Sequence, residues 1–173
     1  MSRHDINMIE YNFCSKCGSP IDEGSEPAHC SHCNTTYYRN AKPGASVLPI
    51  RDGKVLLAKR GREPYKGMYD IIGGFMEADE APEDAAIREA KEETGLDVKI
   101  TRLLGIYVDR YGEDGDYTLN IHYIAEVLGG EMQAMDDIVG LEWIPIEDVP
   151  MEGFQNTQDA LRDLIKLYKQ GEL

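Results

Sequence analysis

The segment from Gly73 to Leu96, GGFMEADEAPEDAAIREAKEETGL, constrains the fold more than any other part of the chain. Pro82 suits the first turn of a helix and Gly95 suits the position just after its end, so the segment predicts a helix over about residues 82–94. Successive residues turn by about 100° around a helix axis, which places one set of side chains toward the core. That set is Ala86, Ile87, Ala90 and Thr94.

Three glutamates, Glu89, Glu92 and Glu93, fall on the adjoining face of this helix. Arg88 lies four residues before Glu92, but neither Glu89 nor Glu93 has a cation at that spacing. Like charges four residues apart destabilise a helix by a few tenths of a kcal/mol. One interpretation is a solvated charged face, and the other is a site for Mg²⁺ or Mn²⁺, whose preferred ligands are carboxylate oxygens.

All four cysteines lie in the first fifth of the chain, in two Cys-x-x-Cys pairs. They are Cys14, Cys17, Cys30 and Cys33. Two such pairs can surround one Zn²⁺ ion with four thiolates, and either His29 or His32 could replace a sulfur. A redox pair or unrelated buried thiols are the alternatives. Because residues 1–40 contain few apolar side chains, we expect the metal to supply much of their folding free energy.

The net charge of −14 bears on the partners of this chain. It argues against a surface that binds nucleic acid by neutralising phosphates. The N-terminal residues lack the apolar core of a secretory signal, and no run approaches the roughly 20 apolar residues of a membrane span. The sequence therefore predicts a cytoplasmic protein without a membrane or nucleic-acid partner, in which structural disulfides are improbable.

The remaining segments alternate between strand and turn patterns. Residues 44–50 and 54–60 read as two strands joined by a tight turn at Asp52-Gly53. Three further β-rich runs and a final helix complete the prediction, over residues 96–111, 117–128, 140–146 and 157–170. This mixture of strands and two main helices predicts an α/β sandwich.

The spacing of nine residues around the glutamates resembles the signature of the Nudix hydrolases, the Nudix box. The matching positions are Gly74, Glu80, Arg88, Glu89, Ala90, Glu92, Glu93, Gly95 and Leu96. The resemblance implies a Nudix α/β/α sandwich with a mixed sheet over residues 41–173. The cysteine pairs imply a zinc ribbon over residues 1–40 in front of it.

The resemblance also implies roles for the matching residues. Arg88 and Glu80 would fix the loop and the helix together as part of the catalytic machinery. Glu89 is the expected general base, although some relatives use an acidic residue in a later loop, for which Asp136 and Asp137 are the candidates. The residues implied in binding Mg²⁺ or Mn²⁺ are Gly74, Glu89, Glu92 and Glu93.

The implied reaction is hydrolysis of the pyrophosphate linkage in a nucleoside diphosphate derivative. The layout resembles the NADH pyrophosphatase branch, but GIYVDRYGEDGD stands where that branch has a Ser-Gln-Pro-Trp-type segment. We therefore expect NAD(H), ADP-ribose, FAD and dinucleoside polyphosphates as substrates, without a strong preference for NADH. The alternatives are a zinc-ribbon regulator that associates with nucleic acid and senses a ligand through its Nudix domain, and a pyrophosphohydrolase that removes damaged nucleoside triphosphates.

Four residues outside the box are candidates for substrate binding. Arg60 and Lys66 belong to the one basic concentration of the chain and could hold phosphates, or could be part of a solvated hairpin end. Tyr111 could stack on a base, or could be a plain hairpin tyrosine. Asp137 could contact the substrate or an outer metal ion, or could belong to a surface loop. A homodimer is a further possibility.

Overall fold

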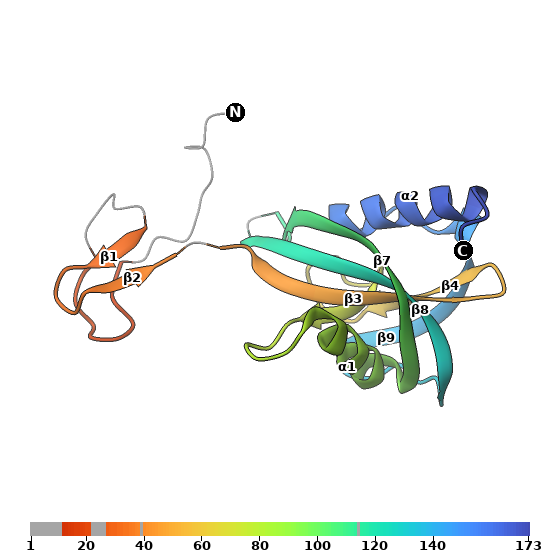
Figure 1. Ribbon diagram of the computed structural model, residues 1–173, viewed down its shortest axis with the longest axis horizontal. Coiled ribbons are helices and arrows are strands. Elements are labelled where there is room, and N and C mark those ends of the chain that lie inside the picture. The colour runs from red at the N-terminus through yellow and green to blue at the C-terminus, as the bar shows by residue number, and fades with distance from the viewer. Residues whose placement is uncertain (1–11, 22–26, 39, 114) are drawn as a thin grey trace. The chain divides into compact units, whose positions relative to one another are not determined.

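The computed structural model describes residues 12–21, 27–38, 40–113 and 115–173 (Figure 1). The chain divides into two compact units, Met1–Ala41 and Lys42–Leu173. Within the described ranges, no helix is both long enough and apolar enough to cross a membrane.

The smaller unit is built around one hairpin. Strand β1 (Ala28–Cys30) pairs antiparallel with β2 (Thr35–Tyr37). Its described core consists of four buried side chains, which are Cys14, Ile21, Ala28 and Cys30. So few buried apolar groups contribute little hydrophobic stabilisation, in line with a unit that depends on its cysteines.

The larger unit contains a sheet of seven strands. They are β3 (Lys42–Arg51), β4 (Lys54–Arg60), β5 (Tyr69–Asp70), β6 (Ile72–Phe75), β7 (Leu96–Arg110), β8 (Tyr117–Gly130) and β9 (Ile138–Pro145). The main strand order is β5-β4-β3-β8-β7, with β6 paired to β3 and β9 paired to β4. Strands β3 and β8 are parallel and the other pairs are antiparallel, which confirms the predicted mixed sheet.

Two helices pack on opposite sides of this sheet, as Figure 1 shows. They are α1 (Pro82–Thr94) and α2 (Gln155–Lys169), and a short 3-10 helix, η1 (Ile146–Asp148), precedes α2. Side chains alternate along β3 and β4, so Val47 and Leu56 pack under α1 whereas Leu48 and Leu57 pack under α2. The predicted α/β/α sandwich is confirmed.

The predicted ends of α1 are confirmed, and Ala86, Ala90 and Thr94 of the expected core-facing set are buried. Gly95 adopts a φ of +70° and its N–H donates to the carbonyl of Lys91, which ends the helix. Ala85 is fully buried, whereas Ile87 is 38% exposed. The one difference from the expected face is therefore that Ala85 is buried in the core and Ile87 is not.

The hairpin between β3 and β4 has the predicted turn. Asp52 and Gly53 have φ values of +51° and +71°, as a two-residue hairpin turn requires. Helix α2 begins at Gln155, two residues earlier than expected, and its buried residues include Leu161 and Leu164. These elements place β6, the acidic face of α1, the end of β4 and the first turn of α2 around one pocket.

Candidate active site

The acidic face of α1 is held by one arginine. Arg88 forms two hydrogen bonds with Glu80, at 2.7 and 3.0 Å, and so ties the loop before the helix to the helix itself. Its Nη1 also lies 2.9 Å from a carboxylate oxygen of both Glu89 and Glu92. The expectation that Glu89 lacks a cation on its own helix is therefore wrong, because the long arginine side chain reaches its neighbour in the sequence as well as the residue four positions later.

Among the residues that the structure describes, no such cation lies beside Glu93. It is 6% exposed, and its Oε2 accepts a hydrogen bond of 3.0 Å from the backbone N–H of Gly73. Burial raises the pKa of Glu93 to about 8, with smaller contributions from the nearby carboxylates of Asp137 and Glu89. Burial also raises the pKa of Glu89. Without a cation, burial thus favours the protonated form of Glu93.

Two glycines of β6 make room for these carboxylates. Gly73 has a φ of +152°, and a Cβ atom there would lie 2.6 Å from Cα of Ser46 on β3. A Cβ atom on Gly74 would lie 2.5 Å from Oε1 of Glu89. Backbone and carboxylate therefore approach each other at a distance that only glycine permits.

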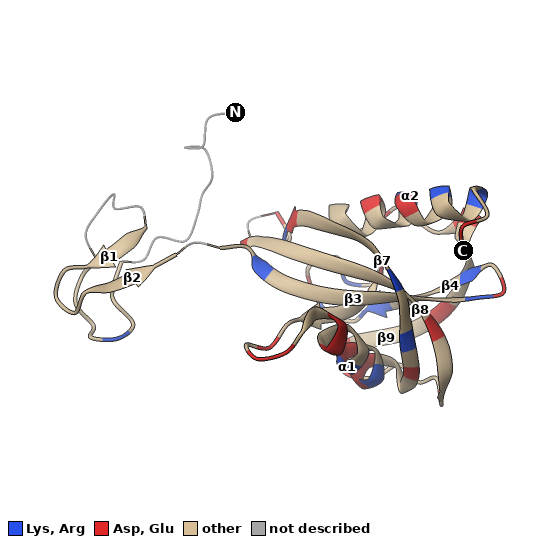
Figure 2. Ribbon diagram, in the orientation of Figure 1, with Lys and Arg blue, Asp and Glu red and all other residues tan. Residues whose placement is uncertain are grey.

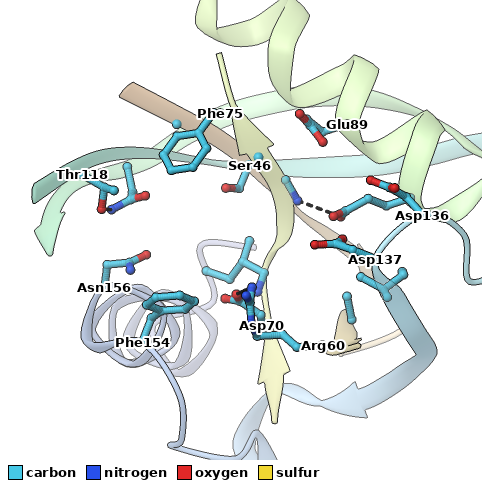
Figure 3. Close-up of a pocket in the computed structure, with 18 of the residues that line it drawn as sticks. Ser46, Arg60, Asp70, Phe75, Glu89, Thr118, Asp136, Asp137, Phe154 and Asn156 are labelled. Atoms are coloured by element: carbon cyan, nitrogen blue, oxygen red, sulfur yellow. Dashed lines mark hydrogen bonds and ion pairs between the residues drawn. The ribbon is translucent and has the colours of Figure 1, made fainter. Parts of the chain in front are cut away.

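The carboxylates line one side of a pocket of about 230 Å³ (Figure 3). Glu89, Glu92 and Glu93 from α1 meet Asp136 and Asp137 from the loop before β9. The structure thus brings together the predicted metal-binding residues and both candidate acids of the later loop. Figure 2 shows the acidic residues of α1 and of the loop before it.

Asp137 is already paired in this pocket. Its carboxylate forms an ion pair with Arg62, and the carbonyl of Asp137 accepts a hydrogen bond from Gly61 at 2.8 Å. These contacts attach the loop before β9 to the end of β4. Asp136, with a φ of +53°, has no such ion pair among the described residues.

The two predicted basic contacts differ in position. Arg60 lines the pocket, where it pairs with Asp70 at 3.0 Å and donates to the carbonyl of Pro64 at 2.7 Å. Its Nη2 is buried and has no hydrogen-bond partner among the described residues. Lys66 is exposed and is not part of the pocket lining.

Tyr111 belongs to a group of aromatic rings at the pocket. Its ring centroid lies 5.7 Å from that of Phe75 and 5.4 Å from that of Phe154, the residue just before α2. The guanidinium of Arg60 lies 4.9 Å from the centroid of Phe154. The sequence analysis identified Tyr111 but not its two aromatic neighbours, because they come from distant segments.

The wall of the pocket opposite the carboxylates is polar and neutral. Its side chains come from β3, β8 and the start of α2, and they are Ser46, Thr118, Asn120, His122 and Asn156. The sequence analysis missed this group. The available signal was Thr118, Asn120 and His122 at alternate positions of an apolar strand, which places all three on one face of the sheet.

The four cysteines form a second candidate site, in the smaller unit. Among the described residues they are the only group of three or more potential metal ligands whose donor atoms lie within 4.8 Å of one another. None forms a disulfide. The N–H groups of Gly18 and Asn34 donate to the carbonyls of Cys14 and Cys30, each at 2.8 Å, so the two Cys-x-x-Cys turns have the same geometry. Four convergent thiols suit a tetrahedral Zn²⁺ ion.

The histidine alternative has less support from the geometry. His29 Nε2 lies 3.0 Å from Oδ1 of Asn34, and His32 is exposed. The hydroxyl of Tyr37, 3.0 Å from Sγ of Cys14, lowers the pKa of that thiol to about 6 and so favours the thiolate that a metal ion requires.

Comparison with known proteins gives the following relatives. The model of the NUDIX domain matches residues 41–165. An ADP-ribose pyrophosphatase from Methanocaldococcus jannaschii is 36% identical over 116 residues, which are 67% of this chain and 68% of that protein. The NAD-capped RNA hydrolase NudC from Stutzerimonas stutzeri is 30% identical over 164 residues, which are 93% of this chain. This chain spans only 57% of the length of that relative.

Among solved structures, a NUDIX hydrolase from Nitrosomonas europaea has a similar fold over nearly the whole chain. The TM-score is 0.79 at 26% sequence identity, and the match covers 93% of this chain and 94% of the other. The similarity therefore includes residues outside the segment that the domain model matches.

Proposed function

Because this chain belongs to the NUDIX family, we propose that it hydrolyses the pyrophosphate linkage of a nucleoside diphosphate derivative with the help of Mg²⁺ or Mn²⁺. The observation that carries the proposal is the buried Glu93, which lies near Glu89 and Asp137 at a pocket and has no cation beside it. An uncompensated carboxylate is costly to bury unless a cation joins it.

The chain offers a suitable set of ligands for that cation. Glu89, Glu92 and Glu93 would hold it, together with the backbone of Gly74. Carboxylate and carbonyl oxygens are the donors that Mg²⁺ and Mn²⁺ prefer. When bound, the cation supplies positive charge that polarises the phosphoryl oxygens of the substrate.

The side chains have separate roles in the reaction. Arg88 and Glu80 keep α1 and its preceding loop in one position, so that the carboxylates stay at the pocket. Glu89 accepts the proton of the attacking water at a carboxylate oxygen, and its raised pKa favours this role. Water adds to one phosphorus, the bridging P–O bond breaks, and two monophosphate products leave.

The substrate proposal rests on the pocket and on the relatives. A polar wall and three neighbouring aromatic rings suit a sugar and a planar ring at the two sides of a diphosphate. The relative from Methanocaldococcus jannaschii carries the name ADP-ribose pyrophosphatase, and we propose ADP-ribose as the first substrate to test. NAD(H), FAD and dinucleoside polyphosphates are the related candidates.

The basic side chains have different proposed roles. Arg60 already pairs with Asp70 and packs on Phe154, so most of its positive charge interacts with these two residues and not with a ligand. One donor, Nη2, remains for a ligand oxygen. Lys66 can act only on the approach of a phosphate, since it lies outside the pocket lining.

We also propose that residues 1–40 and 41–173 act as two domains, a zinc ribbon and a hydrolase. The division into compact units near residue 41 and the cysteine group in the smaller unit support this proposal. Zinc would have a structural role there, since four cysteine ligands leave no open position for a substrate.

The test is a substrate panel with and without Mg²⁺ or Mn²⁺, in the wild type and in Glu93→Gln. We expect metal-dependent release of monophosphates from ADP-ribose, and a fall in kcat of at least about 100-fold in Glu93→Gln. The matched control is Glu131→Gln, which removes an exposed carboxylate outside the pocket. Near-normal turnover in Glu93→Gln would contradict the metal argument. A preference for NADH over ADP-ribose and FAD of more than about tenfold would contradict the substrate expectation.

A further inference from the structure

Two chains of hydrogen bonds in the neutral wall of the pocket end at the same residue, Asp109 on β7. The hydroxyl of Thr118 donates to the backbone carbonyl of Asp109 at 3.3 Å. The carboxylate of Asp109 accepts from the backbone N–H and the side-chain Nδ2 of Asn156, at 3.0 and 3.1 Å. A carbonyl and a carboxylate can only accept hydrogen bonds. Asp109 is therefore the final acceptor of both chains, and this determines which atom donates at each earlier step.

The first chain leaves an acceptor on Asn120. Thr118 has a single hydroxyl hydrogen, which it gives to Asp109, so its oxygen must accept from its other neighbour. That neighbour is Nδ2 of Asn120, at 2.9 Å. The amide orientation of Asn120 is thereby determined. Its Oδ1 is left as an acceptor, and no residue that the structure describes donates to it.

The second chain leaves an acceptor on His122. Because Nδ2 of Asn156 faces Asp109, its Oδ1 faces Nε2 of His122, at 3.0 Å. Nε2 must therefore carry the proton, and Nδ1 of the neutral ring is an acceptor. Burial lowers the pKa of His122 to about 4, so the ring is neutral near pH 7. Nδ1 is buried and has no partner among the described residues.

The two acceptors lie on one face of β8, two residues apart. Strand residues rise by about 3.3–3.4 Å each, so the backbones of Asn120 and His122 are about 7 Å apart. Because both side chains are on the same face, two hydroxyl groups on neighbouring carbons can each donate one hydrogen bond, one to each acceptor. A phosphate or carboxylate offers no donor and would be repelled.

The position of the acceptors relative to β6 selects the part of the substrate. Ser46 of β3 pairs with Gly73 on one side and with His122 on the other, so β8 is two strands away from the glycine pair. Neighbouring strands are about 4.7–4.9 Å apart, which makes this separation about 10 Å. If the diphosphate lies at Gly73 and Gly74, the group attached directly to it comes next to β8. In a nucleotide that group is the sugar, and the base lies farther on.

We propose that Asn120 and His122 bind the 2′- and 3′-hydroxyls of a ribose and make the enzyme selective for ribonucleotides over deoxyribonucleotides. This inference rests on the proposed function, because the diphosphate sets the position of the sugar. Asp109, Thr118 and Asn156 are positioning residues in this arrangement. They orient the two acceptors.

The test compares symmetric substrates, so that it does not matter which half enters the pocket. The probes are diadenosine diphosphate and its counterparts with 2′-deoxyadenosine or 3′-deoxyadenosine at both ends. We expect kcat/KM in the wild type to be at least about tenfold higher for the ribose compound than for either deoxy compound. Equal kcat/KM values for the three compounds would overturn the inference while leaving the proposed function intact.

Asn120→Ala identifies the residue responsible. It should reduce the ribose preference to about two- to threefold by lowering kcat/KM for the ribose compound, with little change for at least one deoxy compound. A merely structural role would lower all three values by the same factor, and that outcome would overturn the inference. His122→Phe, which keeps a ring of similar size, is the second variant and should reduce the preference in the same way. Gln170→Ala, which removes an amide at the exposed end of α2, is the control and should keep the wild-type preference.

Absence of hydrolysis with every compound would be a different result. If the wild type with Mg²⁺ or Mn²⁺ cleaved neither the three diadenosine compounds nor ADP-ribose, the proposed function itself would fail. In that case the ribose selectivity would fail with it, since its geometry depends on a bound diphosphate.

Discussion

At the scale of single residues, the candidate site has many carboxylates and few cations. Arg88 contacts Glu80, Glu89 and Glu92, and this leaves Glu93 as the buried acid without a partner of opposite charge. Burial raises the pKa of Glu93 to about 8, so a divalent cation would take the place of a proton there and stabilise the buried carboxylate.

His122 gives a prediction about the dependence of stability on pH. Its pKa in the folded protein is about 4, compared with an ordinary value of 6.5. Between these values the unfolded chain binds a proton that the folded protein does not, so stability falls as the pH falls from about 6.5 to 4. The loss from this one residue is at most about 3 kcal/mol.

The measurement is urea unfolding at several pH values between 4 and 7. In His122→Gln, which does not titrate, the free energy of unfolding should fall less steeply with decreasing pH than in the wild type. His32→Gln serves as the control, because His32 is exposed. Identical slopes for the wild type and His122→Gln would show that the histidine is not buried as a neutral ring.

At the scale of elements, the site depends on the close contact between β6 and β3. Gly73 pairs with Ser46 in this antiparallel contact and donates its N–H to Glu93 on α1. One short strand thus connects the sheet to the acidic helix. The first turn of α2 is attached to the other side of the pocket, where Thr157 donates to Asp70 at 2.6 Å.

Gly73→Ala should disturb this connection. The φ of +152° is unfavourable for alanine, and the added Cβ would lie 2.6 Å from Cα of Ser46. We expect a loss of at least about 1–3 kcal/mol in the free energy of unfolding, together with reduced hydrolysis. Gly129→Ala is the control, since a Cβ there would meet nothing within 4 Å. Equal unfolding midpoints in urea for the two variants would contradict this account of β6.

At the scale of the whole molecule, the two units are stabilised in different ways. The larger unit buries two apolar clusters, one under each helix. The described core of the smaller unit has four side chains, and two of these are cysteines. A unit with so small a core requires another source of folding free energy, which a metal ion can provide.

We predict one tightly bound zinc ion per chain, held by the four cysteines. Elemental analysis of protein that has never been exposed to a chelator should give close to one equivalent of zinc per chain. Cys30→Ser should lose most of the metal, because Cys30 is fully buried in the cluster. Less than about half an equivalent in the wild type would contradict a zinc ribbon.

The sequence by itself determined the features that depend on local chemistry. Pro82 and Gly95 gave both ends of α1, and Asp52-Gly53 gave the hairpin between β3 and β4, because these residue types have restricted or unusual backbone conformations. Runs rich in β-forming residues, separated by turn patterns, indicated the strands. The spacing of the glutamates and cysteines was enough to single out both candidate sites.

The tertiary structure alone decided which residues surround those sites. Ile87 lies outside the core and Lys66 lies outside the pocket lining, because both outcomes depend on packing between segments that are distant in the sequence. The acceptors on Asn120 and His122 could be identified only from the hydrogen bonds that connect these residues to Asp109 through Thr118 and Asn156. Local propensity cannot show such contacts, since it contains no information about which strands and helices meet.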